Sequence, residues 1–264
     1  MLSLQPTLLP IRAFTDNYIW TLADGSGRAV IVDPGDAAPV LAACEHGLAP
    51  VAILVTHHHP DHIGGIAALL ERFEVPVFAP SEERIALPVQ RVADDERIRI
   101  DALNVEFDVL AVPGHTRSHI AFHARFDDGD VLFCGDTLFS LGCGRMFEGT
   151  PEQMLASLDR LAALPDETKV CCAHEYTLGN AAFARHVDPD NAALAQRIAQ
   201  ARAQRSAGEP TLPSRLADER ACNPFLRCDV PAIAQAVAKL VDGDEADRVE
   251  TFARLRHWKD GFVA

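Results

Sequence analysis

The sequence predicts a mixed α/β protein that ends in a smaller, all-helical C-terminal domain. Short apolar runs of strand length recur between residues 8 and 173, and helix-like segments with capping residues lie between them. From about Tyr176 onward the pattern is helical almost throughout. Because strand-bearing and all-helical segments form separate layers, we expect one domain over residues 1–175 and a smaller helical domain over residues 176–264.

The N-terminal elements are predicted from turn and cap residues. The turn Asp24-Gly25-Ser26-Gly27 indicates a hairpin, and Asp36 and Gly47 are suited to begin and end a helix. Val51–Val55 is a continuous apolar run, typical of a strand covered on both faces. The expected strands cover residues 8–14, 18–23, 29–33, 51–55, 75–79, 97–100, 104–112, 120–126, 131–134 and 169–173.

The expected helices follow from apolar periodicity and capping. One covers residues 63–73, and Thr150, Pro151 and Gln153 form the start of another that ends near Leu164. Asp188-Pro189 is expected to begin a long helix that stops near Gly208, and two amphipathic segments follow from Val230.

Composition narrows the class of protein. The chain has 264 residues, with 24 basic against 38 acidic ones and a net charge of −14. That charge argues against nucleic acid and anionic membrane as partners, since their phosphates require basic surface. Met1–Pro10 lacks signal-peptide features, and the seven cysteines show no disulfide or metal-binding spacing. We therefore expect a cytoplasmic protein. A monomer is also expected, although composition does not determine the oligomeric state.

Histidine and aspartate cluster directly after the Val51–Val55 strand. His57, His59, Asp61 and His62 lie within six residues. In an extended loop, side chains two residues apart point the same way, so the loop offers two adjacent ligand sets. Three further candidates each follow another expected strand: His115, Asp136 and His174. Imidazole and carboxylate at several strand ends predict a metal site on one edge of a sheet.

This pattern resembles the metallo-β-lactamase superfamily. The resemblance implies an αββα sandwich and two divalent metal ions per chain, with zinc as the first expectation and iron or manganese as alternatives. It implies one metal on His57, His59 and His115, a second on Asp61, His62 and His174, and Asp136 bridging both. A hydroxide shared by the metals, rather than a side chain, would be the nucleophile. Asp33 and His119 are expected to orient this site, and His58 to be structural.

Local stretches further resemble glyoxalase II, the hydroxyacylglutathione hydrolase family. They are Phe14–Trp20, Thr56–His59, Cys143–Gly149, His174–Thr177, Asn223–Arg227 and Arg256–Asp260. The resemblance implies hydrolysis of S-D-lactoylglutathione to D-lactate and glutathione, the second step of methylglyoxal detoxification. It also implies that residues 1–175 form the catalytic domain and residues 176–264 the substrate-binding domain. The implied substrate contacts are Arg145, Phe147, Tyr176, Arg256 and Lys259. Arg145 and Phe147 stand where the family frequently has Lys and Tyr.

Other functions are compatible with parts of this pattern. A lactonase or generic thioesterase is the most serious alternative. A redox enzyme with a single iron would not need Asp61, His62 and His174, and a nuclease would need a basic surface. A non-catalytic relative would be expected to have lost ligands, whereas this chain has the complete set.

Overall fold

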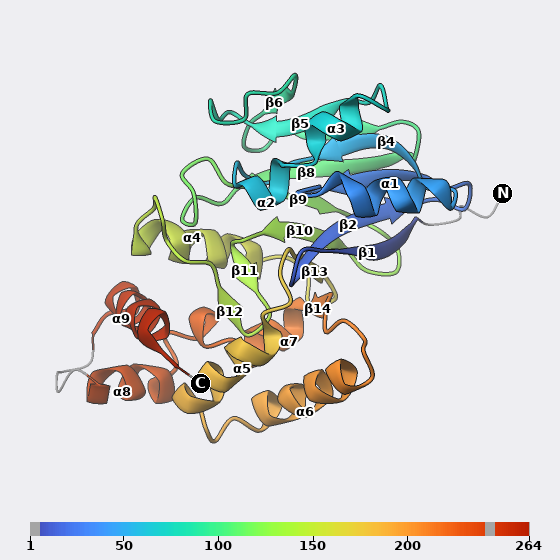
Figure 1. Ribbon diagram of the computed structural model, residues 1–264. Helices are drawn as coiled ribbons and strands as arrows, with labels where there is room; N and C mark the ends of the chain where they lie inside the picture. The colour runs from blue at the N-terminus through green and yellow to red at the C-terminus, as the bar shows by residue number, and fades with distance from the viewer. Residues whose placement is uncertain (1–5, 241–245, 264) are drawn as a thin grey trace. The chain divides into compact units, whose positions relative to one another are not determined.

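The computed structural model describes residues 6–240 and 246–263 and divides the chain into two compact units (Figure 1). The first unit comprises Met1–Ala111 and Ser118–Gly135, and the second comprises Val112–Arg117 and Asp136–Ala264. The sequence predicts no signal peptide in Met1–Pro10, and residues 1–5 of that stretch lie outside the described residues. None of the described helices is long and apolar enough to cross a membrane.

The first unit contains two sets of paired strands. One sheet has the order β1-β2-β3-β4-β5-β6, antiparallel as far as β3 and parallel from there to β6. Strands β7 to β10 pair antiparallel in sequence order. The elements are β1 Thr7–Ala13, β2 Asn17–Ala23, β3 Arg28–Val32, α1 Ala37–Glu45, β4 Ala49–Leu54, α2 Pro60–Ile63, α3 Ile66–Leu70, β5 Val77–Pro80, β6 Gln90–Val92, β7 Arg97–Ile100, β8 Val105–Ala111, β9 Ile120–Ala124 and β10 Val131–Gly135.

Helices α1 and α3 cover one face of the first sheet (Figure 1). Val40 and Leu69 from these helices pack with Ile31 and Ile53 from the sheet in one apolar core. Strands β2 and β9 are buried along their whole length, as expected for strands covered on both faces. The predicted alternation of strands and helices is thereby confirmed in this unit.

The predicted helix 63–73 is wrong in one respect, because it is interrupted at Gly64-Gly65. Helix α2 ends at Ile63 and α3 begins at Ile66. A Cβ on Gly65 would lie 2.4 Å from the backbone nitrogen of Ala37, so the chain passes directly against the start of α1 there. The helix is therefore interrupted where the two backbone segments come into close contact.

The second unit is mainly helical, as predicted for the C-terminal part of the chain. Its elements are β11 Leu138–Phe139, β12 Gly142–Cys143, α4 Pro151–Ala162, β13 Lys169–Cys172, α5 Thr177–Val187, α6 Ala192–Ser206, β14 Ser214–Arg215, α7 Leu216–Cys222, a 3₁₀ turn Pro224–Leu226, α8 Pro231–Leu240 and α9 Arg248–Gly261. Strands β11 and β12 form an antiparallel hairpin, and β13 pairs with β14.

The long helix expected from Asp188-Pro189 begins later. Asn191 is the N-cap of α6 and accepts a hydrogen bond from the Leu194 N–H. Asp188 is instead the C-cap of the preceding helix, α5. The Asp188 carboxylate accepts hydrogen bonds from Asn191 and Arg227 instead. The domain boundary expected near residue 175 stays a prediction.

Candidate metal centre

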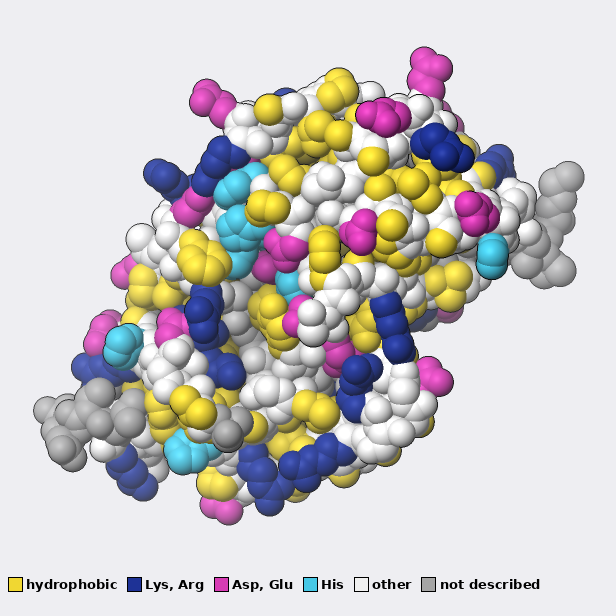
Figure 2. Space-filling model, viewed as in Figure 1, with side chains coloured by type: hydrophobic (Ala, Val, Ile, Leu, Met, Phe, Trp, Pro, Cys, Tyr) yellow, Lys and Arg dark blue, Asp and Glu magenta, His cyan; other side chains and the backbone are white. Residues whose placement is uncertain are grey.

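The loop after β4 brings two histidine rings together within the first unit. His57 Nδ1 lies 3.0 Å from Thr56 Oγ1, and its Nε2 lies 3.1 Å from His59 Nδ1. His57 is fully buried and stacks on His119 with ring centroids 4.6 Å apart. Two imidazole nitrogens that converge so closely suit a shared cation. Figure 2 shows histidine side chains gathered on one part of this unit, with acidic side chains beside them.

Asp33 orients this loop from the end of β3. Its two carboxylate oxygens accept hydrogen bonds from the Thr56 N–H at 2.8 Å and the Thr56 hydroxyl at 2.7 Å. The second oxygen also lies 3.0 Å from His62 Nδ1. A carboxylate on one ring nitrogen fixes the tautomer and leaves Nε2 of His62 available to a metal ion. Asp33 has φ 51°, a conformation that an aspartate adopts more readily than most residues.

Asn17 is a site residue that the sequence reasoning missed. Its side-chain amide donates to Asp61 Oδ2 at 3.1 Å, and Asp61 Oδ2 lies 3.6 Å from His62 Nε2. The amide thus holds one expected ligand beside another. Asn17 lies in the stretch Phe14–Trp20, whose family resemblance marks the segment but does not reveal this contact.

The second unit supplies its own set of donors around Asp136. The Oδ2 atom of Asp136 lies 3.4 Å from His115 Nε2, and its Oδ1 atom lies 3.4 Å from His174 Nε2. All three residues are at least nine-tenths buried. His115 Nδ1 is 2.8 Å from the Arg145 carbonyl oxygen, which leaves Nε2 available to a metal ion. A carboxylate with one oxygen toward each of two imidazoles has the donor arrangement of a bridging ligand.

Aromatic rings flank these histidines. The Tyr176 ring stacks on His174, with centroids 4.7 Å apart and planes 6° apart, and Phe139 meets Tyr176 edge-on at 5.3 Å. Phe147 lies edge-on to His115 at 5.2 Å and is 63% exposed. Tyr176 and Phe147 therefore present ring surface to solvent directly beside two expected metal ligands.

Three expected substrate cations belong to one cluster with Asp260. Arg256 Nη2 lies 3.0 Å from Asp260 Oδ1, and Arg145 Nε lies 3.4 Å from the same oxygen. Lys259 Nζ lies over the Phe183 ring, 5.4 Å from its centroid. Burial lowers the pKa of Lys259, and the nearby Arg256 and Arg145 lower it further. Asp260 was not among the predicted site residues, although it ends the stretch Arg256–Asp260 noted in the sequence.

The cysteines are poorly suited to act as nucleophiles. All seven are free, and six are buried. Burial raises the pKa of Cys143 to about 11 and that of Cys228 to about 12. Since the thiolate is the reactive form, these side chains remain thiols near neutral pH.

Comparison with known proteins decides the family. Residues 17–174 match the model of the metallo-beta-lactamase superfamily, and residues 175–262 match that of the hydroxyacylglutathione hydrolase C-terminus. A protein from Xanthomonas euvesicatoria named hydroxyacylglutathione hydrolase is 59% identical over 97% of this chain and 98% of its own length. The chain belongs to the hydroxyacylglutathione hydrolase family. The resemblance noted in the sequence is confirmed, and with it the metallo-β-lactamase fold followed by a helical C-terminal region.

Solved structures agree with this fold. ETHE1 from Myxococcus xanthus is 25% identical, with a TM-score of 0.64 over 97% of this chain and 90% of its own. A protein crystallised in a di-iron-bound form is 32% identical, with a TM-score of 0.51 over 64% of this chain and 91% of its own. Family membership and the His and Asp donor sets of this chain indicate a dimetal site.

Proposed function

We propose that this chain hydrolyses 2-hydroxyacyl glutathione thioesters, and S-D-lactoylglutathione in particular, to D-lactate and glutathione. This is the second step of methylglyoxal detoxification. The observation that carries the proposal is the 59% identity over nearly the whole chain to a protein named hydroxyacylglutathione hydrolase. The match to the family's C-terminal model adds support, because it covers the region with Arg256 and Lys259.

Two divalent metal ions are proposed to occupy the donors described above. His57, His59 and His115 would hold one, Asp61, His62 and His174 the other, and Asp136 would bridge them. The two 3.4 Å approaches to Asp136 within the second unit support this role. Zinc is our first choice, with iron and manganese as alternatives, since His and Asp bind all three. Such metals would lower the pKa of a coordinated water and polarise the thioester carbonyl.

The chain's own residues bind and orient the glutathione part of the substrate. Glutathione carries two carboxylates, and a protein of net charge −14 needs local cations to attract them. Arg145, Arg256 and Lys259 supply these cations, while Tyr176 and Phe147 offer exposed ring surface. Because thiolate is a good leaving group, the reaction needs little help from a general acid.

The proposal also covers the protein's cellular location, oligomeric state and partners. We expect a cytoplasmic monomer that needs neither nucleic acid nor membrane. The seven free cysteines are consistent with a reducing compartment.

A substrate panel tests the proposed function against a lactonase or a generic thioesterase. Metal-loaded protein would be offered S-D-lactoylglutathione, glutathione thioesters with other acyl groups, thioesters of a small neutral thiol, and lactones. We expect thiol release to be fastest from 2-hydroxyacyl glutathione thioesters. Preferred turnover of lactones, or equal turnover of thioesters with and without glutathione, would contradict the proposal.

A further inference from the structure

The β11–β12 hairpin lies in the chain between Asp136 and Arg145. Its two ends meet where the Gly144 N–H donates to the Thr137 carbonyl at 3.1 Å. A Cβ on Gly144 would lie 1.9 Å from the Asp136 carbonyl oxygen, so only glycine allows this approach. The hairpin conformation therefore determines how Arg145 is placed relative to Asp136.

The hairpin tip has a conformation that needs outside support. Leu141 has φ 59°, in the left-handed region that a leucine seldom adopts. Its side chain is fully buried, and its N–H donates to Glu219 Oε2 at 2.8 Å. Without that acceptor, a buried N–H would be left unsatisfied in a backbone that is already unfavourable.

Glu219 is a buried carboxyl group on α7, and one of its oxygens accepts the hydrogen bond from the hairpin tip. Its Oε2 also lies 3.2 Å from Asn223 Nδ2, and that amide donates to the carbonyls of Phe139 at 3.1 Å and Gly142 at 2.9 Å. Asn223 thus contacts one residue of each hairpin strand as well as the carboxylate. Burial raises the pKa of Glu219, so a neutral side chain of the same length is a suitable replacement.

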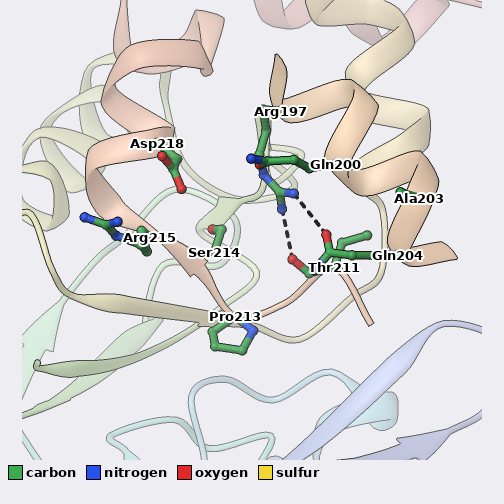
Figure 3. Close-up of a pocket in the computed structure, with 9 residues that line it drawn as sticks. All are labelled: Arg197, Gln200, Ala203, Gln204, Thr211, Pro213, Ser214, Arg215 and Asp218. Carbon is green, nitrogen blue, oxygen red and sulfur yellow. Dashed lines mark hydrogen bonds between the residues drawn. The ribbon is translucent and has the colours of Figure 1, made fainter. Parts of the chain in front are cut away.

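Helices α5 and α6 contact the same tip. Asn180 donates to the Ser140 carbonyl at 3.1 Å, and Arg197 Nη2 lies 3.4 Å from Ser140 Oγ. Arg197 also lines a pocket of about 460 Å³. Figure 3 shows its guanidinium there, donating a hydrogen bond to the Thr211 carbonyl. Asp218 lines this pocket from α7, next in sequence to Glu219. Polar side chains from three helices therefore meet at the hairpin.

We infer that Glu219, together with Asn223, is a positioning residue that holds the β11–β12 hairpin in the conformation presenting Arg145 to glutathione. The inference rests on the proposed function and extends it to residues outside the expected metal and substrate contacts. Packing alone does not require a buried acid at position 219, since an apolar side chain would fill the same volume with a lower desolvation cost. The inference gives this acid a role.

The test compares Glu219→Asp and Glu219→Gln with the parent protein. Glu219→Asp keeps the carboxyl group but withdraws it from Leu141, whereas Glu219→Gln keeps the length and an acceptor oxygen. Asp218→Asn, one residue away and facing the pocket, is the matched control. The readouts are KM and kcat for S-D-lactoylglutathione, and amide hydrogen exchange of residues 138–145.

We expect Glu219→Asp to raise KM roughly tenfold with kcat changed less than about twofold, and to speed exchange at residues 138–145. Glu219→Gln and Asp218→Asn should match the parent in both readouts. Parent-like KM and exchange in Glu219→Asp would overturn the inference, and so would a loss confined to kcat. A parent protein without thioesterase activity would refute the proposed function instead, while the exchange readout would still test the hairpin contact.

Discussion

Arg256 donates a hydrogen bond from Nη1 to the carbonyl oxygen of Cys143 at 2.9 Å. The arginine is 4% exposed, and its guanidinium also lies over the Phe225 ring, 5.2 Å from the centroid. Cys143 lies two residues before Arg145. Arg256 is therefore expected to bind substrate, and it also contacts the loop that carries Arg145, a second expected substrate cation.

Replacing Arg256 should weaken substrate binding more than chemistry. We predict that Arg256→Ala raises KM for S-D-lactoylglutathione roughly 10- to 100-fold, the range for a lost hydrogen bond to a charged group, with a smaller effect on kcat. The contact is remote from the reacting bond, which is why KM should carry the effect. Arg254→Ala, on the same helix with its surface pair to Glu250, is the control and should change KM little. A loss of kcat at unchanged KM would count against this role.

Phe147 offers a gain-of-binding prediction. The family frequently has tyrosine at this position, and the 63% exposure of Phe147 leaves room for a hydroxyl. Phe147→Tyr should lower KM by roughly two- to tenfold, the effect of one added hydrogen bond. Phe126→Tyr, which adds a hydroxyl at a partly exposed position in the first unit, should leave KM unchanged. If both variants behave alike, position 147 does not contact substrate.

The lowered pKa of Lys259 predicts that substrate binding depends on pH. Because burial and the adjacent Arg256 and Arg145 lower its pKa, Lys259 loses its proton at lower pH than an ordinary lysine. Below that pKa the ammonium attracts a glutathione carboxylate, so KM should rise as pH increases through it. The measurement is a KM profile between about pH 7 and 10, below the usual lysine pKa. Lys259→Arg should remove the rise, since arginine stays charged, and an unchanged profile in that variant would exclude Lys259 as its source.

Asp33 should act on metal affinity through the residues that it orients. Asp33→Asn keeps an acceptor for the Thr56 N–H but removes the charge beside His62 Nδ1. We expect zinc affinity, measured by competition with a chelator, to fall roughly 10- to 100-fold. Asp36→Asn is the matched control, because asparagine caps a helix as well as aspartate. Equal zinc affinities for the two variants would show that the Asp33 contact does not tune the site.

Much of the fold could be predicted because its signals are local. The turn at Asp24 and the cap at Asp36 each depend on residues a few positions away, and both occur in the structure as expected. The break at Gly64-Gly65 and the pairing of β13 with β14 depend on contacts distant in sequence, which periodicity does not contain. Strands as short as β11 and β12, with two residues each, show no alternation to detect.

Some residues of the candidate site could likewise be predicted from local sequence, and others could not. The ligand types and their places after strands are local signals, so all seven expected ligands could be proposed from sequence. Asn17 and Glu219 are different, because their importance lies in hydrogen bonds to residues 44 and 78 positions away. An isolated asparagine or glutamate in a sequence does not reveal such a partner.

The most direct test of the two-metal thioesterase is a titration of the metal-free protein with zinc while thiol release from S-D-lactoylglutathione is recorded. We predict that activity rises to a plateau at about two zinc ions per chain, as two-metal chemistry requires. Asp136→Ala should stay inactive throughout, because the proposed bridging carboxylate is absent. A plateau at one metal per chain, or full activity in Asp136→Ala, would show that a two-metal site bridged by Asp136 is not required.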